Sequence, residues 1–309
     1  MALKDITTFI TGFCLFILGM HQLSTGLHNT TTFHFKNIIN NYKLNPLLGI
    51  IIGGLCTALL QSSSGTTVIV VGLVDAQVLN LYQATSIIMG ANIGTTITGQ
   101  LIALDISRYL SLVIIFGLVL IFCFRKKYYS LGIALIGFSL IFIGIDNMRV
   151  GIEPLQNVIR FQEILSELRN SPSLGLLMGF LTTAIIQSSS TGIAILQSLS
   201  SNSLITLKSA IAILIGLNIG TCVTTLLSSI ALNISGKRAA LIHLLFNLLG
   251  ALLIFPFINL LCNVVMMLSP INMSQQIAHA HTLFNVISTI IFLPFITLFV
   301  KLACKIIKK

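Results

Sequence analysis

The chain alternates between long apolar stretches and short polar ones. Seven apolar stretches approach the roughly 20 residues that an α-helix needs to cross a bilayer. They cover residues 6–27, 82–104, 109–124, 131–148, 205–231, 237–258 and 277–300. Two further apolar stretches, 46–75 and 172–201, are each interrupted by the polar run Gln-Ser-Ser-Ser. Each arm beside an interruption is only about half a bilayer long, so these stretches predict two re-entrant helical hairpins.

The two interrupted stretches belong to a longer internal repeat. Residues 57–104 match residues 183–230 without a gap at an offset of 126, so Gln61–Ser64 corresponds to Gln187–Ser190. The block G-x-N-I-G-T occurs in both copies, and glycines of the first helix recur at an offset of 125. We therefore expect the following organisation: repeat one at 6–104, a linking helix at 109–124, repeat two at 131–230 and two C-terminal helices at 236–309.

The linking helix reverses the second copy, which predicts two repeats of inverted topology. Basic residues lie beside apolar spans, at 125–127, 237–238 and the C-terminus. The positive-inside rule then puts the N-terminus outside and the C-terminus inside. Hairpin one would enter from the cytoplasm and hairpin two from outside, with their tips meeting near the midplane.

Composition supports this organisation. Apolar residues make up 55% of the chain and charged residues 8%, whereas a soluble domain averages about 25% charged residues. The mean hydropathy is +1.02. We expect an all-α polytopic membrane protein whose residues 1–309 form one transmembrane transport domain in the plasma membrane.

The first span is not expected to be a cleavable signal peptide. The polar stretches 28–45 and 149–171 are each long enough for one interfacial helix. The net charge of +10 does not indicate nucleic-acid binding, because the basic residues flank the spans.

The repeated polar motifs predict an anion and cation site. Serine hydroxyls and the amides of Gln and Asn donate and accept hydrogen bonds, and free N–H groups at a helix N-terminus favour anions. Two glycines in each G-x-N-I-G-T block predict a broken transmembrane helix whose carbonyls can coordinate Na⁺. The predicted substrate and ion ligands are Gln61, Ser62, Ser63, Ser64, Thr66, Asn92, Thr95, Gln187, Ser188, Ser189, Ser190, Asn218 and Thr221.

Neither motif contains Lys or Arg. Because a buried anion without a countercharge is very costly, a cation must accompany it, and oxygen-rich motifs suit Na⁺. Protons are weaker candidates as coupling ions, since the carboxylates of Asp75, Asp105 and Asp146 all lie near span ends.

At these residues the chain resembles the type II sodium/phosphate cotransporter family. The resemblance extends from Gly12–Met20 through both Q-S-S-S blocks to two H-x-x-F-N runs that begin at His243 and His281. It implies Na⁺-coupled phosphate transport at the motifs given above, with Asp105 as a loosely aligned further cation ligand. The chain departs from the family in lacking an H-x-x-F-N run after the first repeat and a C-terminal regulatory domain of the PhoU type. It looks like a short bacterial form.

The polar blocks and the two histidines admit other interpretations. Isolated Ser and Thr in membrane helices usually serve packing, but two matched blocks disfavour that explanation. An intramembrane serine hydrolase would use Ser64 with His243 or His281, although such a site needs no duplication. A passive anion channel, an arsenate transporter or a phosphate exporter could share the scaffold. We expect no enzyme activity and no cofactor beyond Na⁺ as coupling ion, and leave a homodimer open. The two histidines could pack helices or support the site.

Overall fold

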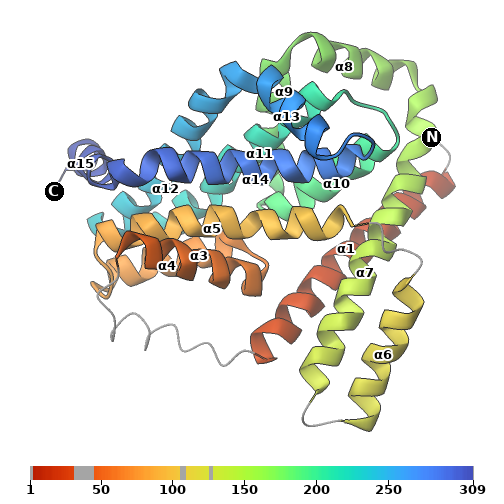
Figure 1. Cartoon of the computed structure of the whole chain (residues 1–309), viewed down its shortest axis with the longest axis horizontal. Helices are drawn as coiled ribbons and strands as arrows, with labels where there is room; N and C mark the ends of the chain where they lie inside the picture. The colour runs from red at the N-terminus through yellow and green to blue at the C-terminus, as the bar shows by residue number, and fades with distance from the viewer. Residues whose placement is uncertain (1–2, 31–44, 105–108, 125–127, 309) are drawn as a thin grey trace.

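The computed structural model describes residues 3–30, 45–104, 109–124 and 128–308. All regular structure in these ranges is helical (Figure 1), which confirms the predicted all-α class for the described residues. The longer helices are α1 (Leu3–Thr30), α3 (Pro46–Leu60), α4 (Ser63–Asp75), α5 (Leu81–Ile102), α6 (Leu110–Cys123), α7 (Tyr129–Ile152), α8 (Ile159–Asn170), α9 (Pro172–Ile186), α10 (Ser189–Ser201), α11 (Leu207–Ser229), α12 (Ile234–Ile254), α13 (Ile258–Leu268), α14 (Met273–Phe292) and α15 (Ile296–Ile306).

Two pairs of short helices occupy the stretches expected to be hairpins. Proline is the first residue of α3 and of α9, where its missing N–H costs no helical hydrogen bond. Each first helix ends at a glutamine in the left-handed conformation, with φ 52° at Gln61 and 58° at Gln187. The first pair reverses direction at this point. The hydroxyl oxygens of Thr57 and Thr66 lie 3.0 Å apart, whereas nine residues of continuous helix would separate them by about 13 Å.

Helices α1 and α7 pack closely through glycines. A Cβ atom added to Gly12 would lie 2.6 Å from the carbonyl oxygen of Gly144, and one added to Gly144 would lie 2.6 Å from that of Gly12. Gly19 and Gly137 face each other in the same way, at 2.7 Å in both directions. In the repeat, Gly12 corresponds to Gly137 and Gly19 corresponds to Gly144. If each residue is replaced by its counterpart, the Gly12–Gly144 contact therefore becomes the Gly137–Gly19 contact. Along this contact the residue numbers rise in α1 and fall in α7, so the two helices are antiparallel.

The prediction that each G-x-N-I-G-T block breaks a helix was wrong. Helices α5 and α11 run through the blocks without interruption. The glycines there allow close packing instead: a Cβ atom on Gly90 would overlap the carbonyl oxygen of Ile50 in α3, and one on Gly216 would overlap that of Leu176 in α9. Asn92, Thr95 and Thr221 of the blocks bond back to carbonyls of their own helices, which an unbroken helix allows.

The C-terminal region also differs in detail from the expected pair of helices. Each of the two is divided by a short 3-10 turn, at Phe255–Phe257 between α12 and α13 and at Leu293–Phe295 between α14 and α15. Both turns contain a proline, which cannot donate the helical hydrogen bond and kinks the helix. The H-x-x-F-N runs lie in α12 and α14, ahead of these kinks.

Five of the seven expected spans are long and apolar enough to cross a membrane: Leu3–Leu27, Tyr129–Ile152, Leu207–Ser229, Ile234–Leu268 and Met273–Ile306. The other two correspond to α5 and α6. Helix α5 has 22 residues but carries many polar side chains, most of them buried against other helices. Helix α6 has 14 residues, or about 21 Å of helix, against a hydrocarbon core of about 30 Å. In Figure 1, α6 lies with α1 and α7 at one end of the molecule.

Candidate functional site

The tip of hairpin one is a helix N-terminus set directly after a left-handed residue. Ser62 is the N-cap of α4, and its hydroxyl accepts a hydrogen bond from the backbone N–H of Gly65 at 3.1 Å. The hydroxyl of Thr66 donates to the carbonyl of Ser62 at 3.0 Å. Ser63 is buried and Ser64 is half-buried. The cap satisfies only one of the first N–H groups of α4, so those of Ser63 and Ser64 have no intrahelical acceptor.

The tip of hairpin two repeats this geometry. Ser188 is the N-cap of α10, and its hydroxyl accepts from the backbone N–H of Thr191 at 3.3 Å and from the hydroxyl of Thr191 at 2.9 Å. Ser189 and Ser190 are buried and supply the first N–H groups of α10. Each tip therefore presents two backbone N–H groups, serine hydroxyls and the positive end of a helix dipole. Such a group binds an anion without a basic side chain.

The motif residues of α5 and α11 are buried beside the hairpins. The side-chain amide of Asn92 donates to the carbonyl of Ile88 at 2.9 Å, and the hydroxyl of Thr95 donates to that of Ala91 at 3.0 Å. Thr221 likewise bonds back to Leu217 at 3.0 Å. These bonds use the hydroxyl protons of the two threonines and one amide proton of Asn92. The lone pairs of the side-chain oxygens remain, and they suit a cation more than an anion.

Asn218 is bonded differently from its counterpart Asn92. Its Oδ1 lies 3.0 Å from Nε2 of His281, and its Nδ2 has no partner among the described residues. Both residues are buried. His281 therefore contacts a predicted site residue directly.

A second histidine belongs to a network that joins the repeats. The hydroxyl oxygens of Thr67 in α4 and Thr225 in α11 lie 2.8 Å apart, and Thr225 Oγ1 lies 3.1 Å from Nδ1 of His243. All three residues are fully buried. Thr67 and Thr225 were absent from the predicted site. The signal that could have found Thr225 is helical spacing, because it lies one turn after Thr221 on the same face.

The two tips differ in one contact. At the first, Gln61 is buried and its Oε1 accepts from the hydroxyl of Thr98 at 2.9 Å. At the second, Gln187 is exposed, and the hydroxyl of Thr224, the counterpart of Thr98, is buried without a partner among the described residues. Within the described residues, no hydrogen bond joins the two Q-S-S-S segments directly. The repeats are alike in sequence here but not alike in conformation.

Comparison with known proteins supports the resemblance seen in the sequence. The sequence model of the Na⁺/Pi-cotransporter family matches the chain twice, at residues 15–150 and 151–291. The chain belongs to the Na⁺/Pi-cotransporter family. The two matches divide it at the boundary between α7 and the segment that leads to hairpin two, so each contains one hairpin and the long helix after it.

The relatives of this Na⁺/Pi-cotransporter family protein include bacterial and animal proteins, and two bacterial ones match most of the chain. YqeW of Bacillus subtilis (strain 168), whose name assigns it no function, is 33% identical over 274 residues, covering 89% of each chain. YjbB of Escherichia coli (strain K12), which is named for a proposed role in inorganic phosphate export, is 29% identical over 262 residues, or 84% of this chain and 48% of YjbB. The chain thus spans about half the length of YjbB.

A shorter match joins the chain to animal proteins. The sodium-dependent phosphate transport protein 2B of Homo sapiens is 57% identical over 60 residues, which cover 19% of this chain and 9% of that protein. No solved structure matches the chain. The family is a transporter family, and together with the five long apolar helices this makes the chain a multi-pass membrane protein.

Two earlier expectations have different outcomes. Asp105, the loosely aligned cation ligand, lies outside the described residues. The geometry is unfavourable for the serine hydrolase alternative: one ring nitrogen of His243 contacts Thr225, one of His281 contacts Asn218, and within the described residues neither histidine bonds to Ser64. A nucleophile needs its base within hydrogen-bond reach, and among the described residues Ser64 has no such contact with either histidine.

Proposed function

We propose that the chain is a secondary active transporter that couples inward movement of Na⁺ to transport of inorganic phosphate. The observation that carries this proposal is the duplicated hairpin tip, in which a left-handed glutamine, a serine N-cap and two buried or half-buried serines open a helix within an apolar protein. The names of the YjbB and 2B relatives, which refer to inorganic phosphate and to sodium-dependent phosphate transport, support phosphate as substrate.

The charge balance supports Na⁺ as coupling ion. The tips offer dipoles and hydroxyls to a phosphate, yet neither Q-S-S-S segment nor the following G-x-N-I-G-T block holds a basic residue. A phosphate in a site of low dielectric needs a countercharge. The oxygens of Asn92, Thr95 and Thr221 lie on buried faces of α5 and α11 and are the hard ligands that Na⁺ accepts.

The contact between α1 and α7 supports an inverted arrangement of the repeats, which alternating access would use. Exchanging the repeats maps the Gly12–Gly144 contact onto Gly19–Gly137, as a two-fold axis between antiparallel α1 and α7 would require. We infer that hairpin one enters from the cytoplasm and hairpin two from outside, with the N-terminus outside and the C-terminus inside the plasma membrane. Rocking of one part against the other would then expose the site to one side at a time.

Two alternatives use the same site. A passive anion channel would move phosphate without Na⁺, and an exporter would run the same cycle in the opposite net direction, as the name of YjbB suggests for that protein. Arsenate has the geometry of phosphate and would occupy the same donors. These alternatives differ from the proposal in ion coupling, direction and substrate, and not in the residues that form the site.

The test is uptake of labelled phosphate into proteoliposomes with an imposed Na⁺ gradient. Accumulation above equilibrium with Na⁺, and its loss when choline replaces Na⁺, is the expected result. Ser63→Ala and Ser189→Ala should each lower apparent phosphate affinity about ten- to a hundredfold, the effect of losing a hydrogen bond to a charged group. Ser139→Ala is the matched control, because Ser139 is also fully buried but its hydroxyl only bonds back to Leu135 of α7. Equal uptake in choline would reject coupling.

A further inference from the structure

A cavity lies away from the hairpin tips, at the far end of hairpin two. Its volume is about 400 Å³, within the range of small-molecule pockets. It is bounded by the last turn of α5, the outer part of α7, the end of α10 and the start of α14. Four serines line it, namely Ser200, Ser201, Ser203 and Ser274. From Ser190 at the tip to Ser201 at the cavity, α10 rises about 16 Å, or half a bilayer.

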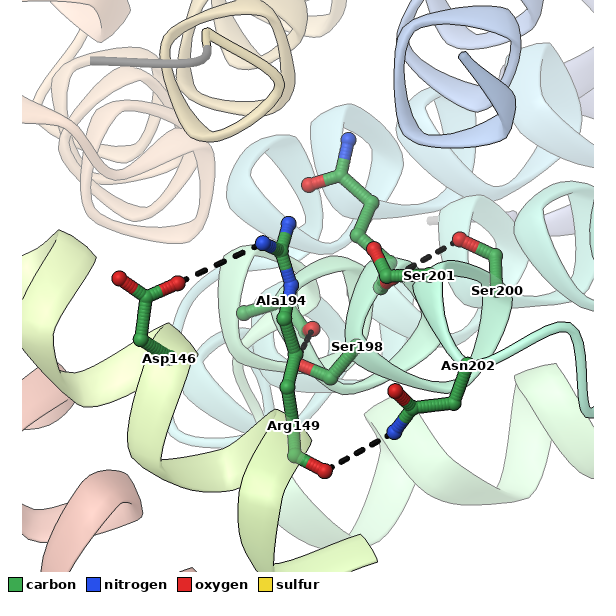
Figure 2. Close-up of polar contacts among 8 residues, drawn as sticks. Asp146, Arg149, Ala194, Ser198, Ser200, Ser201 and Asn202 are labelled. Atoms are coloured by element: carbon green, nitrogen blue, oxygen red, sulfur yellow. Dashed lines mark hydrogen bonds and ion pairs between the residues drawn. The ribbon is translucent and has the colours of Figure 1, made fainter. Parts of the chain in front are cut away.

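One cation points into this cavity. Arg149 of α7 lines it, and Figure 2 shows its side chain between Asp146 and the helix α10 that carries Ser198 and Ser201. Nη1 of Arg149 lies 3.4 Å from Oδ1 of Asp146, a long contact that uses one of the five guanidinium protons. Nε is buried and has no partner among the described residues. The main-chain carbonyl of Arg149 accepts from Nδ2 of Asn202 at 2.9 Å, which fixes α7 against the end of α10.

The opposite wall is the N-terminus of α14. Asn272 is its N-cap, with its side chain accepting from the N–H of Gln275 at 3.1 Å, so the N–H groups of Met273 and Ser274 have no intrahelical acceptor. The hydroxyl of Ser274 is unpartnered among the described residues, although the residue is only 4% exposed. A buried hydroxyl needs a hydrogen-bond partner, and Ser274 lies where a ligand in the cavity could supply one.

The end of hairpin one can be compared with the end of hairpin two, where the cavity lies. At the corresponding end of hairpin one, Asp75 is the last residue of α4, and its carboxylate accepts from the backbone N–H of Asn233 at 2.8 Å and from Nδ2 of Asn233 at 3.2 Å. Asn233 is the N-cap of α12, as Asn272 is of α14. An anion of the protein itself thus sits at the start of α12. The counterpart of Asp75 in hairpin two is Ser201, so hairpin two brings no carboxylate to the start of α14.

We propose that this cavity binds a small tetrahedral oxyanion from the aqueous phase, held by Arg149, the hydroxyl of Ser274 and the N-terminal amides of α14. Within the transport cycle, and resting on the function proposed above, the ligand is phosphate waiting outside hairpin two. The planar guanidinium of Arg149 carries paired N–H groups that match two oxygens of such an anion. Since Asp146 offsets part of the charge of Arg149, binding is weak enough to release the ion toward the tip. Unlike the tips, the cavity has its own cation and needs no Na⁺.

The test is chemical protection of a reporter in the cavity. Ser203→Cys, in a background without the native cysteines, is labelled with a thiol reagent while inorganic phosphate is titrated in choline buffer without Na⁺. Phosphate should slow labelling, and adding Arg149→Gln should raise the half-protecting concentration about tenfold, the loss expected for one charge-assisted hydrogen bond. Arg149→Lys should recover part of the protection. Arg160→Gln is the matched control, because Arg160 of α8 carries the same charge but its side chain is 85% exposed. That variant should retain wild-type protection.

The outcomes separate this site from the hairpin site. Protection that appears only with Na⁺, or that survives Arg149→Gln unchanged, overturns the cavity site and leaves the proposed function intact. Wild-type protein that shows Arg149-dependent protection but no Na⁺-driven uptake would reject the proposed function and keep the cavity site. A lipid phosphate group has similar chemistry, so the titration is also run in lipid-free detergent micelles. If added anionic lipid slows the labelling and inorganic phosphate does not, binding of a free oxyanion is overturned.

Discussion

Replacing Thr225 with valine should weaken the connection between the two repeats. The side chains have nearly the same shape, so the substitution removes a hydroxyl and little else. Two hydrogen bonds are lost, to the hydroxyl of Thr67 at 2.8 Å and to Nδ1 of His243 at 3.1 Å. Thr67 also donates to the carbonyl of Ser64 at 3.1 Å, in the first turn of α4. The perturbation therefore reaches the hairpin tip through one helical turn.

The magnitude follows from the burial of all three side chains, each 0% exposed. A buried polar group left without its partner costs about 1–3 kcal/mol, and side-chain hydrogen bonds between membrane helices average about 0.6 kcal/mol. Thr67 keeps its bond to Ser64, so His243 bears most of the loss. We expect Thr225→Val to destabilise the protein by about 1–2 kcal/mol and to lower the midpoint of thermal unfolding by a few degrees.

The neighbouring residue provides the control. The hydroxyl of Thr224 is buried but has no partner among the described residues, so Thr224→Val should leave stability equal or slightly higher. Both variants are heated in detergent, and the fraction that remains monodisperse is measured. A double-mutant cycle with Thr67→Val should give a coupling energy of about 0.5–1 kcal/mol. Equal midpoints for the Thr224 and Thr225 variants, or strict additivity in the cycle, would refute the network.

Three further predictions concern packing and topology. Gly216→Ala should prevent correct packing of α11, because its Cβ would overlap the carbonyl oxygen of Leu176, whereas Gly72→Ala meets nothing within 4 Å and should be neutral or stabilising by thermal unfolding. Lys4→Cys should be labelled from outside intact cells and Lys308→Cys only after permeabilisation; labelling of both from one side contradicts the inferred orientation. Gln77→Cys and Ser203→Cys, at matched exposed positions after the two hairpins, should be labelled from opposite sides if the hairpins are inverted.

The bounds of the two short helix pairs agree with the predicted ranges because local chemistry favours their ends. Pro46 and Pro172 begin the first helices, and the polar Gln-Ser step cannot continue an apolar helix, so α3–α4 and α9–α10 fill the predicted ranges 46–75 and 172–201. The glycines of G-x-N-I-G-T were interpreted wrongly because the sequence does not distinguish a glycine that unwinds a helix from one that admits a neighbouring backbone. Only the approach of α3 to Gly90 and of α9 to Gly216 separates these roles.

The contacts that join the site residues could not have been predicted. Thr67 and Thr225 are 158 residues apart, and His281 and Asn218 are 63 apart, so their pairing depends on how whole helices pack. The C-terminal helices show the same limit. The H-x-x-F-N runs were visible in the sequence, but only the structure turns one histidine toward Asn218 of the site and the other toward the threonine pair between the repeats.

The difference between the two tips is the feature that bears most on mechanism. The two matched Q-S-S-S segments place their glutamines differently: Gln61 is buried and bonded to Thr98, while Gln187 is exposed and Thr224 has no partner among the described residues. The glutamines and threonines are matched, but the residues that follow differ, with Thr66 and Thr67 in the first repeat and Gly192 and Ile193 in the second, so the two glutamines lie in different environments. Inverted repeats that exchange conformations would produce this arrangement, with Gln187 bonding to Thr224 when Gln61 leaves Thr98. A ligand would then shift the populations of the two arrangements only through unequal binding to them. If the two tips had identical conformations, a ligand between them would not bind the two arrangements unequally. Tips in different conformations allow such unequal binding.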